Sequence, residues 1–223
     1  MTPEPILFLA SASFCAAVLF KIFRNAGTSR QAFAGIIIWL LFSGFLAISG
    51  ILSDFQSLPP RMGLIIFPGI LALVFAAKSK KIIPIIQATP QSLLIYAQSF
   101  RIVVEIVLFM LVSNGAIPKI MSWEGRNFDI LIGLSAPIIG YLYCQKKAMS
   151  DTMLKAWNYL GIGLLINVVA HGLLSAPTPF QVFDTSPANT FIASWPYVWL
   201  PALLVPTAFF LHIISIRKLN LHK

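Results

Sequence analysis

Polar and ionisable side chains that could bind a ligand lie in or beside the long apolar runs of this sequence. They are Gln98, Arg101, Glu105, Asn127, Asp129, Asn167 and His171. Arg101 and Glu105 stand inside the run 90–113, where a charged side chain costs about 2.5–3.5 kcal/mol to insert into a bilayer. Such residues usually face the interior of a bundle and are paired. We therefore expect Arg101 to hold an anionic or carbonyl group, while Glu105 or Asp129 balances its charge.

A polar stripe follows one side of the helix expected at 90–113. At about 100° per residue, an arc of roughly 80° contains Gln91, Leu94, Gln98, Arg101 and Glu105. With a rise of about 1.5 Å per residue, Arg101 lies near the middle of the bilayer and Glu105 about 6 Å further out. The outer third of the bilayer also receives Asn127, Asp129, Asn167 and His171. The sequence therefore predicts that these groups converge on an outward-facing polar pocket.

Two other interpretations of the same residues remain open. In a purely structural one, Arg101 pairs with Glu105 four residues on, or with Asp129 across helices, and locks the bundle without any ligand. In an enzymatic one, Glu105 and His171 act as general acid and base. The sequence contains no GxSxG, HExxH, CxxC, GxGxxG or Walker motif, so we assign no catalytic residue and favour a protein that is not an enzyme.

The sequence offers no cofactor or metal site. Cys15 and Cys144 fall at different predicted depths, which argues against a disulfide or a metal pair. His171 and His212 lie at opposite ends of their helices, so one haem cannot bridge them. A retinal Schiff base is not expected either, because the last apolar run has no lysine before Lys218.

Composition excludes an ordinary soluble domain. Of the 223 residues, 58% are hydrophobic and only 10% are charged, against about 25% charged residues in a typical soluble protein. The formal net charge of +9 would suggest a nucleic-acid partner in a soluble protein. Here the basic residues form short clusters between apolar runs, which membrane orientation explains better. The expected partner is the lipid bilayer, and the oligomeric state stays open.

Seven apolar runs predict an all-α membrane bundle. Most of them approach the length of about 20 residues that a membrane-spanning helix needs. The expected spans are 6–23, 32–52, 63–77, 90–113, 128–144, 153–175 and 192–216, within a single domain covering residues 1–223. The second run holds small residues of the kind that allow close helix packing.

Basic residues predict the orientation of the bundle. Of the sixteen Lys and Arg residues, only Arg61, Lys119 and Arg126 fall on one side of this topology, and Arg101 lies within the bilayer. The opposite side, which the positive-inside rule makes cytoplasmic, carries Lys21, Arg24, Arg30, Lys78, Lys80, Lys81, Lys146, Lys147, Lys155, Arg217, Lys218 and Lys223. We therefore expect a multi-pass protein of the bacterial inner membrane, with its N-terminus outside and its C-terminus in the cytoplasm.

Local signals refine this topology. Thr89 before a proline is typical of an N-cap, so it should begin the central helix, and Asn127 should cap the fifth helix with Asp129 in its first turn. The segment 82–86 is too short to span and should lie in the inner interface. The external loop 176–191 is apolar enough to fold back as a lid.

Several sequence blocks resemble a family of bacterial polytopic membrane proteins that has no assigned activity. The blocks are FRIVVE at 100–105, EGRNFDILIGLSAP at 124–137, WNYLGI at 157–162, SAPTPFQVF at 175–183 and LPALLVPTAFFLHIISIRKL at 200–219. The resemblance supports the topology and draws attention to Arg101, Asn127, Asp129 and His212, but it implies no reaction.

We therefore interpret the sequence as an integral inner-membrane protein whose polar pocket binds or transports a small molecule. One alternative is a membrane-embedded enzyme acting on a lipid or isoprenoid substrate. Another is a scaffold subunit of a membrane complex, because Gly133, Ala136 and Gly140 form a small-residue seam at helical spacing.

Overall fold

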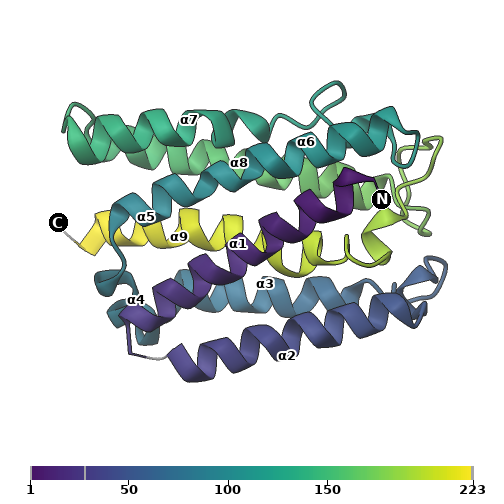
Figure 1. Ribbon diagram of the computed structural model, residues 1–223, viewed down its shortest axis with the longest axis horizontal. Coiled ribbons are helices and arrows are strands. Elements are labelled where there is room, and N and C mark those ends of the chain that lie inside the picture. The colour runs from purple at the N-terminus through teal and green to yellow at the C-terminus, as the bar shows by residue number, and fades with distance from the viewer. Residues whose placement is uncertain (1, 28, 222–223) are drawn as a thin grey trace.

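The computed structural model describes residues 2–27 and 29–221, and within these ranges helices are the only regular secondary structure. Long helices run along the long axis of the molecule and turn back at its two ends (Figure 1). The N-terminal and C-terminal ends of the chain lie at opposite ends of this axis (Figure 1). Lys223, one of the basic residues expected in the cytoplasm, lies outside the described residues.

The long helices correspond to the predicted apolar runs. They are α1 (Pro3–Asn25), α2 (Ser29–Ile48), α3 (Gly63–Lys78), α5 (Gln91–Tyr96) continuing into α6 (Phe100–Ser113), α7 (Ile130–Gly140), α8 (Asp151–Leu174) and α9 (Val205–Leu221). Short turns join or extend them: the 3₁₀ turns η1 (Ile51–Ser53), η2 (Lys80–Ile82), η3 (Ala97–Ser99), η4 (Lys119–Met121) and η6 (Phe191–Ala193), helix α4 (Ile83–Ala88), and the π turns η5 (Tyr141–Gln145) and η7 (Leu200–Leu204).

Five of the described helices are long and apolar enough to cross a membrane. They cover Pro3–Asn25, Arg30–Ile48, Gln91–Ser113, Asp151–Leu174 and Leu200–Leu221. A sixth crossing is possible if α3 and the segment Lys80–Ala88, bent by 78° from it, count as one span. The helix Ile130–Gln145 is apolar but shorter. Length and composition thus support five or six crossings.

Several predicted boundaries were wrong. The second helix ends at Ile48 and not at residue 52, because Gly50 adopts a left-handed conformation (φ 73°) that ends the helix. The last helix begins at Leu200 and not at residue 192, after a segment that contains Pro196. Thr89 does not cap the central helix, since its hydroxyl donates to the carbonyl of Ile85 (2.7 Å), four residues earlier.

The central helix and α9 form the interior of the bundle. In the most apolar stretch of each, 56% of residues are buried, against 22% in α2. Helix α1 packs on α6 and α2, α8 packs on α9, and α3 packs on the other side of α9. Helix α2 therefore lies at the periphery, while the polar stripe of the central helix lies inside.

Candidate binding site in the polar interior

The polar stripe of the central helix is enclosed by other helices. Gln98, Arg101 and Glu105 are 0%, 1% and 2% exposed, respectively. The helix tightens into the 3₁₀ turn η3 just before Arg101. The prediction that this stripe faces the inside of the molecule is therefore confirmed.

Arg101 forms an ion pair across helices. Its Nη1 donates to Oδ1 of Asp129, at the start of α7, over 2.9 Å, and both side chains are almost fully buried. Gly133 allows this approach of α7 to α6, because a Cβ added there would lie only 3.0 Å from the backbone nitrogen of Ile102. Of the two structural pairings expected for Arg101, the structure contains the one with Asp129.

Asn127 connects the ion pair to Glu105. Its Nδ2 donates to Oε1 of Glu105 (2.7 Å) and to the carbonyl of Met121 (3.1 Å). Its Oδ1 accepts the backbone N–H of Asp129 (3.0 Å), so it forms a turn directly before α7 begins at Ile130. Arg101, Glu105, Asn127 and Asp129 thus lie together, and we refer to these four residues as the Arg101 network.

Several atoms of this region have no hydrogen-bond partner among the described residues. They are Nε and Nη2 of Arg101, Oε2 of Glu105 and Oε1 of Gln98. Buried polar atoms are nearly always paired, because leaving one unpaired costs about 1–3 kcal/mol. Nε and Nη2 form one edge of the planar guanidinium group, which matches the two oxygens of a carboxylate or phosphate.

A second polar chain, which sequence analysis missed, lies between α5, α8 and α9. Gln91 and Asn158 both donate to the Ser215 hydroxyl, and Oδ1 of Asn158 lies 2.8 Å from Nδ1 of His212. Gly161 provides room for the His212 ring, which an added Cβ would overlap. The individual residues were visible in the apolar runs, but their pairing depends on how three helices are rotated about their axes.

Asn167 and His171 stand apart from the Arg101 network. Asn167 donates to the backbone carbonyl of Arg126 (2.7 Å), and the His171 ring stacks on Phe183 with centroids 5.3 Å apart. In the described part of the chain, no hydrogen bond or ion pair joins them to Arg101 or Glu105. The structure therefore divides the seven predicted ligand-binding residues into a buried group of five and an outer pair.

The outer pair lies beneath the loop that follows α8. The backbone N–H groups of Val182 and Phe183 both donate to the carbonyl of Leu174 (2.9 Å each), which returns the loop onto the end of α8. The Arg126 guanidinium lies 5.6 Å from the centroid of the Phe183 ring. A shallow hollow of about 480 Å³ lies here, lined by Lys119, Ile120, Gly125, Arg126, Val182, Phe183, Asp184 and Thr185.

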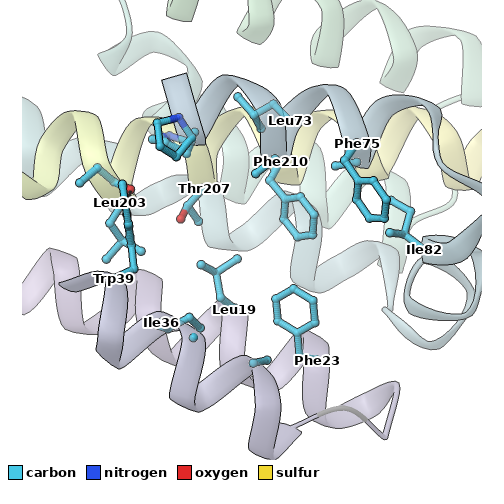
Figure 2. Close-up of a pocket in the computed structure, with 18 of the residues that line it drawn as sticks. Leu19, Phe23, Ile36, Trp39, Leu73, Phe75, Ile82, Leu203, Thr207 and Phe210 are labelled. Atoms are coloured by element: carbon cyan, nitrogen blue, oxygen red, sulfur yellow. Dashed lines mark hydrogen bonds between the residues drawn. The ribbon is translucent and has the colours of Figure 1, made fainter. Parts of the chain in front are cut away.

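A larger cavity, of about 610 Å³, lies on the other side of the molecule between α1, α2, α3, α4 and α9. Figure 2 shows Leu19, Phe23 and Ile36 on one side of it and Leu73 and Phe210 on the other. We refer to it as the apolar groove. Its polar side chains are Gln31, Thr207 and Trp39, and the indole N–H of Trp39 donates to the carbonyl of Ala202 (2.8 Å).

The sequence does not predict this groove, because its lining carries no polar pattern. Gly35 lines it, and a Cβ added there would meet no atom within 4 Å. The small residues of the second run were expected to mark close helix packing, and at Gly35 that expectation was wrong. The carbonyl of Ala202 belongs to the π turn η7, whose irregular hydrogen bonding places this acceptor at the wall of the groove.

The small-residue seam of α7 is used within the chain. Gly133 lies against Ile102 and Arg101, and a Cβ added at Gly140 would meet the Tyr96 ring at 2.5 Å. Ala136, between them, is fully buried. The seam therefore packs on α5 and α6.

Among the described residues, no group of three or more His, Cys, Asp and Glu side chains is arranged to hold a metal ion. Both cysteines, Cys15 and Cys144, are unpaired thiols.

Comparison with known proteins identifies the family. The model of a domain of unknown function, DUF8737, matches residues 59–220, which is more than half of the chain. The chain belongs to the DUF8737 family. The DUF8737 match covers the whole Arg101 network together with α3 and α9 of the apolar groove, whereas α1 and α2 precede it. No curated protein and no solved structure matches the chain.

Proposed function

We propose that the chain is a multi-pass protein of the bacterial inner membrane with seven crossings, an external N-terminus and a cytoplasmic C-terminus. An odd number of crossings is consistent with chain ends at opposite ends of the bundle (Figure 1). In this proposal, the crossings beyond the five long helices are assigned to the bent pair of α3 and α4 and to the shorter apolar helix Ile130–Gln145. The concentration of basic residues near one end supports the orientation.

Within that topology, we propose that the protein binds or transports a small molecule through the Arg101 network. One observation carries this proposal: Arg101 is 1% exposed, yet only Nη1 has a partner, while Nε and Nη2 have none among the described residues. An arginine whose sole role was to hold two helices together would direct all its donors to protein acceptors. The unpaired edge supports a ligand that carries a carboxylate or a similar planar acceptor.

The neighbouring groups fit such a ligand. Asp129 already balances the charge of Arg101, and Asn127 fixes one oxygen of Glu105. The other oxygen, Oε2, has no partner among the described residues and can accept a hydrogen bond from a hydroxyl or amine of the ligand. Access from outside would pass the loop around η4, whose Met121 carbonyl is bonded to Asn127.

The two alternatives have less support in the geometry. The enzymatic interpretation needs Glu105 and His171 in one site, yet Glu105 bonds to Asn127 and His171 stacks on Phe183. The scaffold interpretation rested on the seam of α7, which packs on α5 and α6 of the same chain.

Ligand-dependent thermal unfolding in detergent tests the proposal. The probes are sodium acetate, pyruvate, succinate and benzoate, each compared with sodium chloride at equal ionic strength. The variant is Arg101→Gln with Asp129→Asn, which removes both charges and leaves two groups that can bond to each other. We expect at least one carboxylate to raise the Tm of the wild-type protein with increasing concentration and to leave that of the variant unchanged.

A matched control is Lys119→Gln, which removes a basic residue whose side chain is 67% exposed. It should keep the wild-type response to every probe. A panel in which no carboxylate distinguishes the wild type from the double variant would contradict the proposed site.

A further inference from the structure

The apolar groove opens on a surface suited to lipid. Helix α2 packs on α1 and α3 packs on α9, so the groove lies between these two pairs (Figure 2). The outer faces of the two flanking helices are apolar and exposed, as shown by Leu41 (68%) on α2 and Leu71 (69%) on α3. An acyl chain entering the groove from the bilayer would therefore contact mostly apolar side chains. The groove shares no residue with the Arg101 network.

Basic side chains gather at one end of the groove. The lining residues at that end are Phe23, Gln31, Phe75 and Ile82. Next to them in the sequence stand five exposed basic residues, which we refer to as the basic rim: Arg24, Arg30, Lys78, Lys80 and Lys81. The groove is thus apolar along its length and cationic at its mouth.

Among the described residues, no acidic side chain forms an ion pair with the basic rim. In residues 2–27 and 29–221, ion pairs join Arg61 to Asp54, Arg101 to Asp129 and Lys119 to Glu124. Other basic residues at the same end of the bundle do have protein acceptors. Arg217 donates to the carbonyls of Ala76 and Ser79, and Lys218 donates to those of Ile86 and Gln87. The basic rim therefore has no acidic partner among the described residues and can bind an anion from outside the chain.

We propose that the apolar groove and the basic rim together bind one anionic phospholipid. Its acyl chains lie in the groove and its phosphate lies among the rim residues. The groove volume falls in the range of about 300–1,000 Å³ that is usual for small-molecule sites. Basic pockets between membrane helices bind anionic headgroups on the cytoplasmic side. A free phosphate would use the rim alone and leave the groove without a role.

Lipid binding measured by native mass spectrometry on delipidated protein tests this site. The probes are dioleoylphosphatidylglycerol, which is anionic, and dioleoylphosphatidylcholine, which has the same chains and no net charge. Gly35→Phe places a ring in the groove, where the space around Gly35 is open. We expect the wild type to prefer phosphatidylglycerol and Gly35→Phe to bind it about tenfold more weakly or worse.

Gly163→Phe is the matched control, since Gly163 also has open space around it but lies on α8, away from the groove. It should bind both lipids as the wild type does. If Gly35→Phe and Gly163→Phe bound phosphatidylglycerol equally well, the proposal that its acyl chains lie in the apolar groove would be wrong.

Charge variants test the rim separately. Lys78→Gln with Lys81→Gln should bind the two lipids equally, whereas Lys146→Gln with Lys147→Gln, which removes two exposed lysines elsewhere at this end, should keep the preference. If the variant Lys78→Gln with Lys81→Gln still preferred phosphatidylglycerol, the proposal that the basic rim binds the phosphate would be wrong. Displacement of the lipid by inorganic phosphate would also contradict the lipid site, since that would indicate a site for free phosphate. None of these lipid measurements involves Arg101. The lipid site can therefore be disproved while the proposed ligand binding at the Arg101 network still holds.

Discussion

The Arg101 network and the apolar groove lie on two sides of α9 and are built in opposite ways. On one side, Gln98, three residues before Arg101, is fully buried and donates to the carbonyl of Ala208. On the other, Thr207, one residue earlier, lines an open cavity of about 610 Å³. The Arg101 network is thus enclosed by helices, whereas the larger of the two cavities described above is lined almost entirely by apolar residues.

In the proposed membrane topology, the difference follows from the hydrocarbon that would surround the bundle in a bilayer. A polar group facing hydrocarbon without a partner costs several kcal/mol, so Arg101 and Asp129 are held between helices and bonded to each other. Apolar side chains gain little from packing together when lipid tails offer equal contacts, so α2 and α3 can stay apart. A cavity in such a protein therefore need not be where the charged residues are.

Among variants of the two regions, Asp129→Ala is expected to lower the free energy of unfolding the most. The change removes the carboxylate that forms an ion pair with the buried Arg101 guanidinium. Breaking a buried ion pair on one side typically lowers the free energy of unfolding by about 3–5 kcal/mol. Unfolding titrations in mixed detergent and sodium dodecyl sulfate measure this loss.

A compensating variant serves as its control. Arg101→Met with Asp129→Leu replaces the pair by apolar side chains, and much of the lost stability should return. Asp129→Ala with wild-type stability would show that Arg101 is not held as described.

A smaller loss of stability is expected when a glycine of the packed interior is replaced, and none when a glycine of the groove is replaced. Gly133→Ala pushes a methyl group against the backbone of Ile102, and overpacking of this kind costs about 1–3 kcal/mol. Gly35→Ala adds the same methyl group in open space and should leave stability unchanged or slightly raised. The same unfolding titration measures both, and equal losses would contradict the contrast between packed interior and open groove.

The smallest effect is expected from Trp39→Phe at the wall of the groove. The variant keeps an aromatic ring but loses the hydrogen bond from the indole N–H to Ala202. A net loss of about 0.5–1.5 kcal/mol is typical of one such bond. Thermal unfolding in detergent would detect this loss of stability. A loss as large as that of Asp129→Ala would contradict the expectation that the groove wall contributes less to stability than the ion pair.

The sequence predicted the helices and the inward stripe well, because both depend on local periodicity. The apolar runs became helices, and Gln98, Arg101 and Glu105 lie inside the bundle as their common face indicated. The helix ends were less predictable where a backbone conformation decides them, as at Gly50.

Features that depend on the rotation of distant helices were not predictable. The choice of Asp129 as the partner of Arg101 depends on how α7 sits against α6, which Gly133 controls. The separation of His171 from this network depends on the course of the loop that carries Phe183. The groove left no trace in the sequence, since an open apolar wall and a packed one use the same residue types.

The most direct test of the central claim is a density map of the protein, held in a phosphatidylglycerol nanodisc, that resolves side chains between α6 and α7. We expect non-protein density within hydrogen-bonding distance of Nε and Nη2 of Arg101, while Nη1 donates to Asp129. A map in which both nitrogens bond to protein side chains, with no other density beside them, would contradict it.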